Sequence, residues 1–422
     1  MAEQHEKALV PQIRFTGFTD PWEQRKLGEL FEEHSEKDRD DLPALTIIQG
    51  GGTVHRDESN RNLQFDRNSL SNYKVVDTGD FIVHLRSFEG GLEKATCCGL
   101  VSPAYHIFRG KNVDSDFYYL YFRSKRFIDA DLKPHVYGIR DGRSIDIEGM
   151  KTIFIPWTNL AEQRRIGAFF DRLDSLITLH QRKYDKLCVL KKSMLDKMFP
   201  KGGSLYPEIR FAGFTDPWEQ RKLGEVASGF EYGLNAAASD FDGEKKYLRI
   251  TDIDDQTREF RTDDLSSPDI NNPIDDRYLL KEGDILFART GASVGKTYLY
   301  KASDGKTYYA GFLIRAHVSD EADAGFIFQS TLTERYKQFV LLTSQRSGQP
   351  GINAQEYSDL LLPLPSLMEQ RRIGAFFDRL DSLITLHQRK YCGVVSWMLG
   401  VALVRLGSES DGAFGEMKHV LR

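Results

Sequence analysis

Residues 162–184 have the sequence EQRRIGAFFDRLDSLITLHQRKY, and residues 369–391 repeat all 23 of them without a change. A second block, residues 12–29 (QIRFTGFTDPWEQRKLGE), returns as residues 208–225 with 16 of its 18 positions identical. We name these blocks the helical repeat and the leading repeat. An interval of about two hundred residues is typical of a duplicated domain rather than of a solenoid. The chain is therefore expected to contain two related halves.

The segments between the repeated blocks, residues 30–155 and 226–362, share almost no sequence but have a common pattern. Each places Gly-Asp, at Gly79 and Gly283, before an apolar strand-like run and then a loop rich in basic, hydroxyl and glycine residues. Further strand-like runs, an aromatic helix and a second glycine-containing loop follow in both. Strands mixed with a few helices indicate α+β domains.

The helical repeat begins a long amphipathic helix. In the first copy, apolar side chains recur at intervals of three and four from Ile166 to Met198. The 38 residues 162–199 would span roughly 57 Å. Such a helix needs a partner along its length, and chain order makes the second copy an antiparallel partner. The predicted helix-pair seam consists of Ile166, Phe170, Leu173, Ile177, Ile373, Phe377, Leu380 and Ile384.

The predicted fold is α+β, with two globular domains separated by a pair of long antiparallel helices and related by a pseudo-two-fold axis. The expected segments are a first domain at residues 1–160, a central helix at 161–206, a second domain at 207–366, a distal helix at 367–406 and a weakly ordered tail at 407–422. Asp-Pro-Trp-Glu is typical of a helix start, so short helices are expected near residues 20–29 and 216–225.

Two residue pairs within the repeats allow more than one interpretation. Trp22 and Trp218 are either binding aromatics or packing anchors, and packing is favoured. His180 and His387 are either sensors or ligands, or polar residues tolerated at the seam that set the helix register, and the last interpretation is favoured.

The distal helix departs from its template after Tyr391, where identity is lost abruptly. Such a break indicates a frameshift or a recombination joint in the gene. Because Gly393 and Gly400 are unfavourable inside a helix, we expect this helix to be shortened or frayed.

Composition is that of an ordinary soluble protein, with 422 residues, 40% hydrophobic and 28% charged. The four cysteines show neither CxxC nor metal-ligand spacing, so no disulfide framework or metal site is expected, and a reducing cytoplasm is the predicted location. The start of the chain lacks an apolar signal core, and the apolar run at residues 394–403 is too short to span a bilayer. The net charge of −5 is only mild evidence against nucleic acid, since binding depends on where cations cluster.

The sequence lacks the catalytic motifs Asn-Pro-Pro-Tyr and HExxH. Residues 291–297 (GASVGKT) resemble a phosphate-binding Walker A loop, but three residues rather than four separate the glycines, and a strand-like run follows. The sequence therefore indicates a recognition protein.

The repeated blocks resemble those of the specificity subunits of type I restriction–modification enzymes. The resemblance rests on FxGFTDPWEQRKLGE at the start of each half, on IP…LAEQRRI at residues 155–166 and on LPLP…EQRRI at residues 362–373. It implies that each variable segment is a target recognition domain for one half of a split DNA sequence, and that the helices space these domains and dock two methyltransferase subunits. Those partners would bind S-adenosylmethionine and methylate adenine N6, and further restriction subunits would use ATP and Mg²⁺. The chain itself would have no cofactor, no metal and no catalysis. On the strength of this resemblance, a DNA-specificity scaffold is favoured over a tandem protein–protein adaptor. A fused restriction–methylation enzyme is disfavoured because methyltransferase motifs are missing.

DNA contacts are expected in two loops of each domain, because Arg, Lys and hydroxyl groups bind phosphates while Arg, Lys, Asn and Gln contact base edges. The candidates in the first domain are Arg86, Ser87, Lys94, Tyr137, Arg140, Arg143 and Ser144. Those in the second domain are Arg289, Thr290, Ser293, Lys296, Arg346, Gln349 and Asn353.

Overall fold

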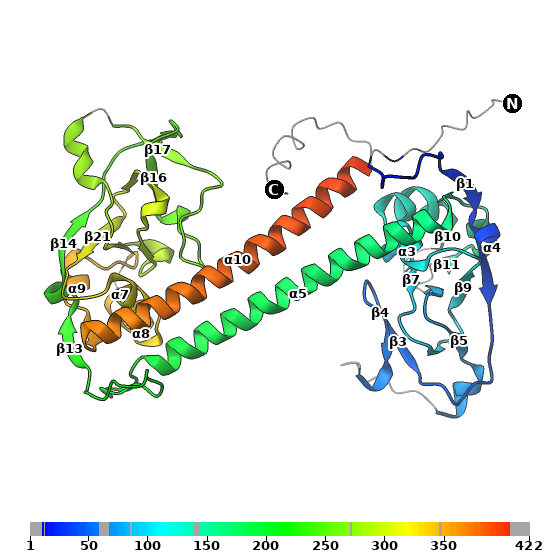
Figure 1. Ribbon diagram of the computed structural model, residues 1–422, viewed down its shortest axis with the longest axis horizontal. Helices are drawn as coiled ribbons and strands as arrows, with labels where there is room; N and C mark the ends of the chain where they lie inside the picture. The colour runs from blue at the N-terminus through cyan, green and yellow to red at the C-terminus, as the bar shows by residue number, and fades with distance from the viewer. Residues whose placement is uncertain are drawn as a thin grey trace. The chain divides into compact units, whose positions relative to one another are not determined.

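The computed structural model describes residues 11, 13–58, 67–84, 87–138, 144–270, 272–345 and 348–405 (Figure 1). It divides into two compact units, one formed by Met1–Leu179 with Cys392–Arg422 and the other by His180–Tyr391. Each unit contains one α+β domain and parts of the long helices α5 (Leu160–Met198) and α10 (Leu367–Arg405). The predicted combination of two mixed domains with a pair of long helices is confirmed.

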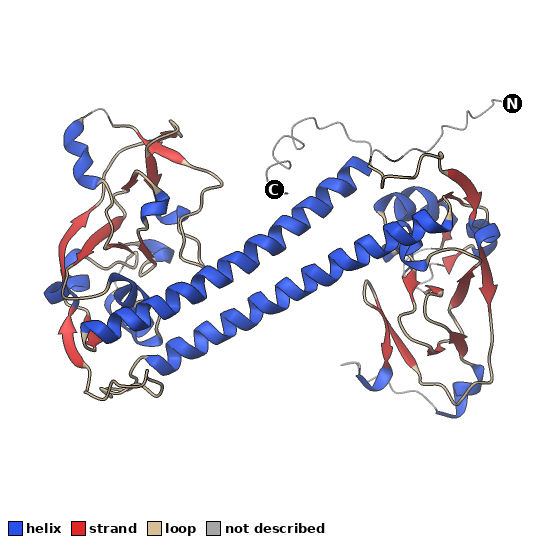
Figure 2. Cartoon of the chain, in the orientation of Figure 1, coloured by secondary structure: helices blue, strands red, loops and turns tan. Residues whose placement is uncertain are grey.

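The first domain is built from short strands with a few helices (Figure 2). Its strands are β1 (Glu23–Lys26), β2 (Phe31–His34), β3 (Leu45–Ile48), β4 (Gly52–His55), β5 (Lys74–Val76), β6 (Phe81–Val83), β7 (Glu93–Lys94), β8 (Gly99–Val101), β9 (His106–Gly110), β10 (Val136–Tyr137), β11 (Ser144–Ile145) and β12 (Phe154–Trp157). Its helices are α1 (Leu27–Leu30), α2 (Ser87–Gly90), α3 (Ser115–Phe122), the π-helical segment Phe127–Leu132 and α4 (Ile147–Lys151).

The second domain has a similar make-up. Its strands are β13 (Glu219–Lys222), β14 (Ala227–Tyr232), β15 (Ala238–Asp240), β16 (Lys246–Leu248), β17 (Ser266–Pro268), β18 (Asp284–Ala288), β19 (Thr297–Leu299), β20 (Thr307–Tyr309), β21 (Leu313–Val318) and β22 (Leu361–Leu364). Its helices are α6 (Leu223–Val226), α7 (Ala324–Ser330), α8 (Glu334–Thr343) and α9 (Ala354–Ser358).

A four-stranded antiparallel sheet lies at the centre of each domain. Its order is β2-β9-β6-β7 in the first domain and β14-β21-β18-β19 in the second. The inner strands β6 and β18 are buried along their whole length, which explains why they are continuous apolar runs after Gly-Asp rather than alternating patterns. Two segments with almost no shared sequence therefore have the same sheet topology, as their common pattern predicts.

The leading repeat forms a strand where a short helix was predicted. Residues 23–26 pair antiparallel with β12, and residues 219–222 pair with β22 in the same register, so the helices expected near residues 20–29 and 216–225 are wrong apart from the single turns α1 and α6. Their N-caps are Lys26 and Lys222, not the aspartates of the Asp-Pro motif. The cap pattern is local, whereas the pairing joins segments about 130 residues apart and satisfies the backbone groups of both.

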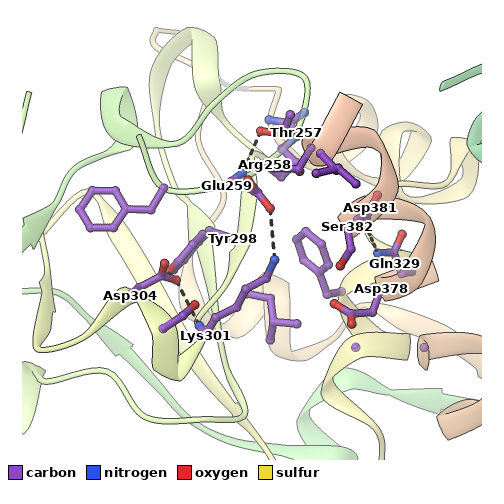
Figure 3. A pocket seen from close by; sticks show the side chains of 18 of the residues that line it. Thr257, Arg258, Glu259, Tyr298, Lys301, Asp304, Gln329, Asp378, Asp381 and Ser382 are labelled. Carbon is purple, nitrogen blue, oxygen red and sulfur yellow. Dashed lines mark hydrogen bonds and ion pairs between the residues drawn. The ribbon is translucent and has the colours of Figure 1, made fainter. Parts of the chain in front are cut away.

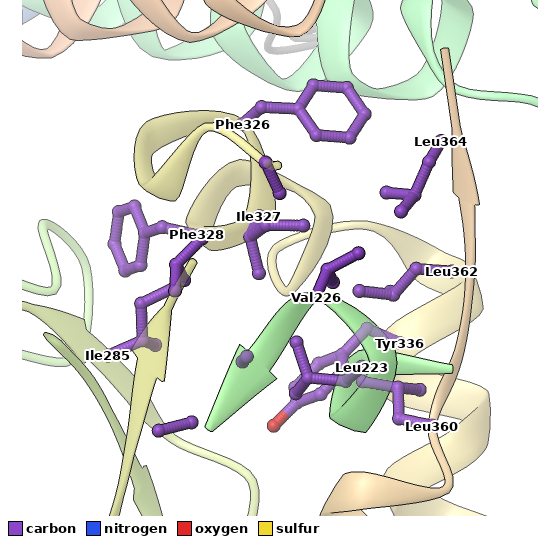
Figure 4. Packing of buried hydrophobic residues seen from close by; sticks show 14 of the residues in the cluster. Leu223, Val226, Ile285, Phe326, Ile327, Phe328, Tyr336, Leu360, Leu362 and Leu364 are labelled. Atoms are coloured by element: carbon purple, nitrogen blue, oxygen red, sulfur yellow. The ribbon is translucent and has the colours of Figure 1, made fainter. Parts of the chain in front are cut away.

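Each long helix begins inside the core of its domain. In the second domain, side chains from α6, α7 and β22 converge beneath the helices, among them Val226, Phe326 and Leu362 (Figure 4). The α10 residues Ile373 and Phe377 belong to the same cluster. In the first domain, Ile166 and Phe170 of α5 pack with Phe117 and other core residues. The helical repeat thus anchors the domain that precedes it.

A buried ion pair and a glycine in each copy explain how the repeats lock together. Arg14 binds the fully buried Glu162 through Nε and Nη2 at 2.6 and 2.7 Å, and Arg210 binds Glu369 in the same way at 2.7 Å for both contacts. Gly374 allows the N-terminus of α7 to approach α10, because a Cβ there would clash with Asp323 Oδ1. Gly167 has the same role against Asp114, so both copies of the helical repeat need a glycine at this position.

Within the second unit, the end of α5 packs antiparallel against the start of α10. His180 lies beside His387, Lys191 beside Asp381, and Phe199 beside Phe377, so the two helices run in opposite directions. The seam residues Leu380 and Ile384 join one cluster with Met198 and with the partly buried Leu187. In contrast, the described contacts of Ile166 and Phe170 are with the first domain rather than along a seam.

Helix α10 extends to Arg405 and has 39 residues, the same length as α5. The expectation of a shortened helix is therefore wrong for the backbone. Glycine costs about 1 kcal/mol in a helix interior, and Gly393 and Gly400 lie among Val, Trp, Met and Leu residues, which continue a helix. The tail predicted at residues 407–422 lies outside the described residues.

Candidate nucleic-acid interface

The two candidate loops of the second domain lie side by side. Gly291 N–H donates to the Pro350 carbonyl at 3.0 Å, and Ile352 N–H donates to the Arg289 carbonyl at 2.9 Å. Thr290 and Gly351 form an antiparallel bridge between these contacts. Segments about sixty residues apart in sequence therefore build one surface, with Arg289 and Thr290 partly exposed and Gln349 and Asn353 exposed.

Arg289 lies over two aromatic rings at this surface. Its guanidinium carbon is 4.9 Å from the ring centroid of Tyr232 and 6.0 Å from that of Phe312. Both rings belong to positions that the sequence analysis missed, at the end of β14 and just before β21. Each lies outside the two candidate loops in sequence, so only the fold reveals that they meet Arg289.

The other candidates of the second domain have different environments. Gln349 lies against Gly291, and Asn353 caps α9 by accepting a hydrogen bond from Glu356 N–H at 2.9 Å. Ser293 closes a 3₁₀ turn, while Arg346 lies outside the described residues. Lys296 is only 8% exposed, and its Nζ contacts the Ile253 carbonyl at 3.2 Å and Asp255 at 2.5 Å. Its ammonium is therefore engaged within the domain.

The Walker-like loop has the context that the sequence indicated. Strand β19 follows directly after Lys296, and the loop leads into no helix. A phosphate-binding loop needs a helix N-terminus at that point. The geometry agrees with rejecting a nucleotide site here.

In the first domain the candidates divide between a buried and an exposed group. Ser87 is fully buried and its hydroxyl accepts a hydrogen bond from His84 N–H at 2.9 Å, so its position is interior. Lys94 is ion-paired with Asp116 and lies 5.4 Å from the Tyr119 ring centroid. Exposed Tyr137 faces Ser144 across the hairpin β10–β11. Arg86, Arg140 and Arg143 lie outside the described residues.

A cavity of about 460 Å³ lies in the second unit between loop 257–259, β19, α7 and α10 (Figure 3). Glu259 binds Lys301 at 3.3 Å, and Gln329 donates to Asp381 at 2.9 Å. Asp381 also binds Lys191 of α5 at 2.6 Å, so this network ties the domain to both helices. The several carboxylates that line the cavity oppose a phosphate, which favours a structural role for it.

Known proteins point to one family. Residues 215–393 match the family model of the type I restriction modification DNA specificity domain. The second half of the chain is such a domain. A type I restriction enzyme MjaVIII specificity subunit from Methanocaldococcus jannaschii is 24% identical over 310 residues, which cover 69% of this chain and 70% of that protein. The predicted family, the type I specificity subunits, is confirmed, and with it a role in DNA recognition.

Solved structures were also similar to this chain. The type I restriction-modification system S subunit from M. genitalium aligns with a TM-score of 0.56 and 15% identity, covering 95% of this chain and all of that one, and it supports the fold. The HsdS subunit from Thermoanaerobacter tengcongensis aligns with a TM-score of 0.41 and 17% identity, covering 90% of this chain and 95% of that one.

Metal binding and membrane insertion find no support among the described residues. No group of three or more His, Cys, Asp or Glu side chains there is placed to hold a metal ion. In the same part of the chain, no helix is both long and apolar enough to cross a membrane.

Proposed function

We propose that each variable domain of this specificity chain binds one half of a bipartite DNA sequence, and that the helix pair sets the spacer and docks two methyltransferase subunits. One observation carries the proposal. Two domains of unrelated sequence share one sheet topology and are attached to the same two repeated blocks. The repeated blocks are nearly identical while the segments between them differ, as expected of a common frame that carries two different DNA-binding domains.

Catalysis and cofactors are assigned to partners in this proposal. The methyltransferase subunits would bring S-adenosylmethionine, and restriction subunits would bring ATP and Mg²⁺. This chain would contribute DNA contacts and geometry alone, inside the cytoplasm where its DNA lies. The binding should depend strongly on salt, because neutralising 6–10 phosphates reduces affinity by about 10³- to 10⁵-fold between 50 and 200 mM salt.

The test combines sequencing of methylated adenines with two altered chains. In the first, residues 226–362 are replaced by the corresponding segment of another specificity chain, and only one half of the methylated motif should change. In the second, seven residues are deleted from α5 and from α10, and the spacer should shorten while both half-sites persist. A spacer that stays constant, or a swap that alters both half-sites, would contradict the proposal.

A further inference from the structure

Tyr232 and Phe312 are exposed aromatic side chains that lie beside Arg289. Tyr232 is 43% exposed and Phe312 is 61% exposed, and they come from the end of β14 and from the turn that leads into β21. Exposed aromatic rings grouped with an arginine are typical of binding surfaces rather than of solvated ones. The group therefore needs an explanation beyond packing.

The main chain of Arg289 is fixed on both sides. Its N–H donates to the Phe312 carbonyl at 3.1 Å, and its carbonyl accepts from Ile352 N–H at 2.9 Å. The side chain then extends over the Tyr232 ring, whose hydroxyl accepts a hydrogen bond from Ala354 N–H at 3.4 Å. Backbone and ring together restrict the guanidinium to a small range of orientations.

The terminal nitrogens of Arg289 are left for a ligand, since no hydrogen bond or ion pair joins them to the described residues. The Nε of Arg289 is enclosed, as is that of Arg315, so only the terminal nitrogens distinguish the two side chains. A neighbouring arginine on the same sheet shows the alternative. Arg315 also lies near a tyrosine ring, but its two terminal nitrogens are occupied by Glu231 at 2.6 Å and by the Arg277 carbonyl at 3.1 Å. Arg289 therefore lies against an aromatic ring as Arg315 does, but no acceptor among the described residues binds its terminal nitrogens.

We propose that Tyr232 and Phe312 are positioning residues that hold Arg289 to contact a guanine in the half-site of the second domain. The inference deepens the proposed function and rests on it. A planar guanidinium donates two parallel hydrogen bonds to guanine O6 and N7, the commonest specific contact in the major groove. Pre-orientation by the rings lowers the entropy lost when that contact forms. Gln349, beside Gly291, lies within the same surface for a neighbouring base.

The experiment uses the full chain together with its methyltransferase subunit and maps methylated adenines across a genome. Arg289→Lys keeps the charge but loses the planar fork. We expect discrimination at one guanine of the second-domain half-site to fall by about 5- to 100-fold, with the other half-site unchanged. Tyr232→Leu and Phe312→Leu should relax the same position to a smaller extent. Tyr232→Phe keeps the ring, and its discrimination should stay near that of the unaltered chain.

Arg261→Lys is the matched control, since Arg261 is an exposed loop arginine bound to Asp263 at 3.0 Å. It should leave the motif unchanged. A half-site without guanine, or an Arg289→Lys variant with an unchanged motif, overturns the inference while the proposed function stands. The inference is also overturned if Arg289→Ala weakens binding equally for all DNA sequences and reduces its salt dependence. Arg289 would then contact a phosphate rather than a base. If the unaltered chain confers no sequence-specific methylation, the proposed function itself fails.

Discussion

Trp218 in the second domain and Trp22 in the first occupy the same position of the leading repeat, yet Trp218 is 1% exposed and Trp22 remains partly exposed. Phe377 and Phe170 hold one position of the helical repeat and are 0% and 9% exposed. Leu380 is buried, while its counterpart Leu173 is only partly so. Identical sequence therefore gives a tighter core in the second domain.

The end of α5 accounts for the difference. Met198 and Phe199 insert into the second core, where the Phe199 ring lies 5.3 Å from Phe326 and 6.0 Å from Trp218. The equivalent positions of the distal helix carry Arg405 and Leu406. The burial of a repeated residue is thus decided by sequence outside the repeat. Trp22, in its more open site, donates to Glu162 at 3.2 Å, whereas the buried indole N–H of Trp218 has no hydrogen-bond partner among the described residues.

The largest effect should come from truncating the tryptophans. Trp218→Ala is expected to destabilise the second domain by about 3–5 kcal/mol, because it removes a large side chain from a closed core. Trp22→Ala should cost the first domain less, because part of that ring already contacts water. Amide hydrogen exchange in each domain separates the two effects, since the chain has more than one folding unit. If both substitutions destabilise their domains equally, packing of Phe199 does not make the second core tighter than the first.

Removing the buried carboxylates should affect the two copies alike. Glu162→Gln and Glu369→Gln each leave a mostly buried arginine without its counter-charge, and we expect about 2–3 kcal/mol of destabilisation in either domain. The same exchange measurement applies, with Glu23→Gln as an exposed control. A cost confined to one domain would show that the ion pairs, like the tryptophans, depend on the end of the long helix beyond the repeat.

Acid should weaken the first domain through Glu162. Burial tends to raise the pKa of this carboxyl, but hydrogen bonds from Arg14 and Thr158 outweigh it and hold the pKa below its ordinary value. Since the folded-state pKa is the lower one, the stabilisation is complete above roughly pH 4.3 and is lost as the pH falls through the folded-state pKa. In Glu162→Gln this part of the acid dependence should vanish.

A smaller gain is expected from giving the end of α10 the sequence that ends α5. Replacing residues 392–422 by residues 185–206 supplies Met and Phe at the positions of Arg405 and Leu406. If the first domain accepts them as the second does, Trp22 becomes buried, and the first domain gains about 1–2 kcal/mol. Tryptophan fluorescence and hydrogen exchange report both changes. The same replacement with Arg and Leu kept at the two positions is the control, and it should give no gain.

Periodicity and repetition were enough to predict the long helices, the duplicated domains and the common pattern of the variable segments. Local capping rules failed at residues 20–29, because the competing strand partner is residues 154–157. The sequence alone could not distinguish the loop candidates with free side chains from those bound within the domain. Arg289 and Lys296 look alike in a basic loop, but the fold exposes the first and pairs the second with Asp255. Tyr232 and Phe312 gave no local signal, since they come to lie beside Arg289 only when β14 and the turn before β21 meet in the fold.

The smallest expected effect concerns the histidine pair, where the two copies of the helical repeat meet within the second unit. The Nδ1 atoms of His180 and His387 are 2.9 Å apart, so one ring must donate and the other accept, and at least one must be neutral. Burial, then the nearby His387, Lys390 and Lys183, lower the pKa of His180. Because the unfolded chain binds this proton more readily, stability should decline as the pH falls below roughly 6.5, the ordinary value, and level off below the folded-state pKa.

The pH dependence of helix protection distinguishes a histidine pair that only sets the helix register from one that acts as a pH sensor. A His180→Gln, His387→Gln chain keeps polar side chains at the crossing but cannot be protonated. Hydrogen exchange of the helix segments 180–198 and 369–390 between pH 7 and pH 5 should then become independent of pH, while the unaltered chain exchanges faster at the lower pH after correction for intrinsic rates. Since both rings are only partly buried, the change should be small beside the loss from Trp218→Ala. An unaltered chain whose helix protection stays constant over this range would leave the pair as a register contact alone.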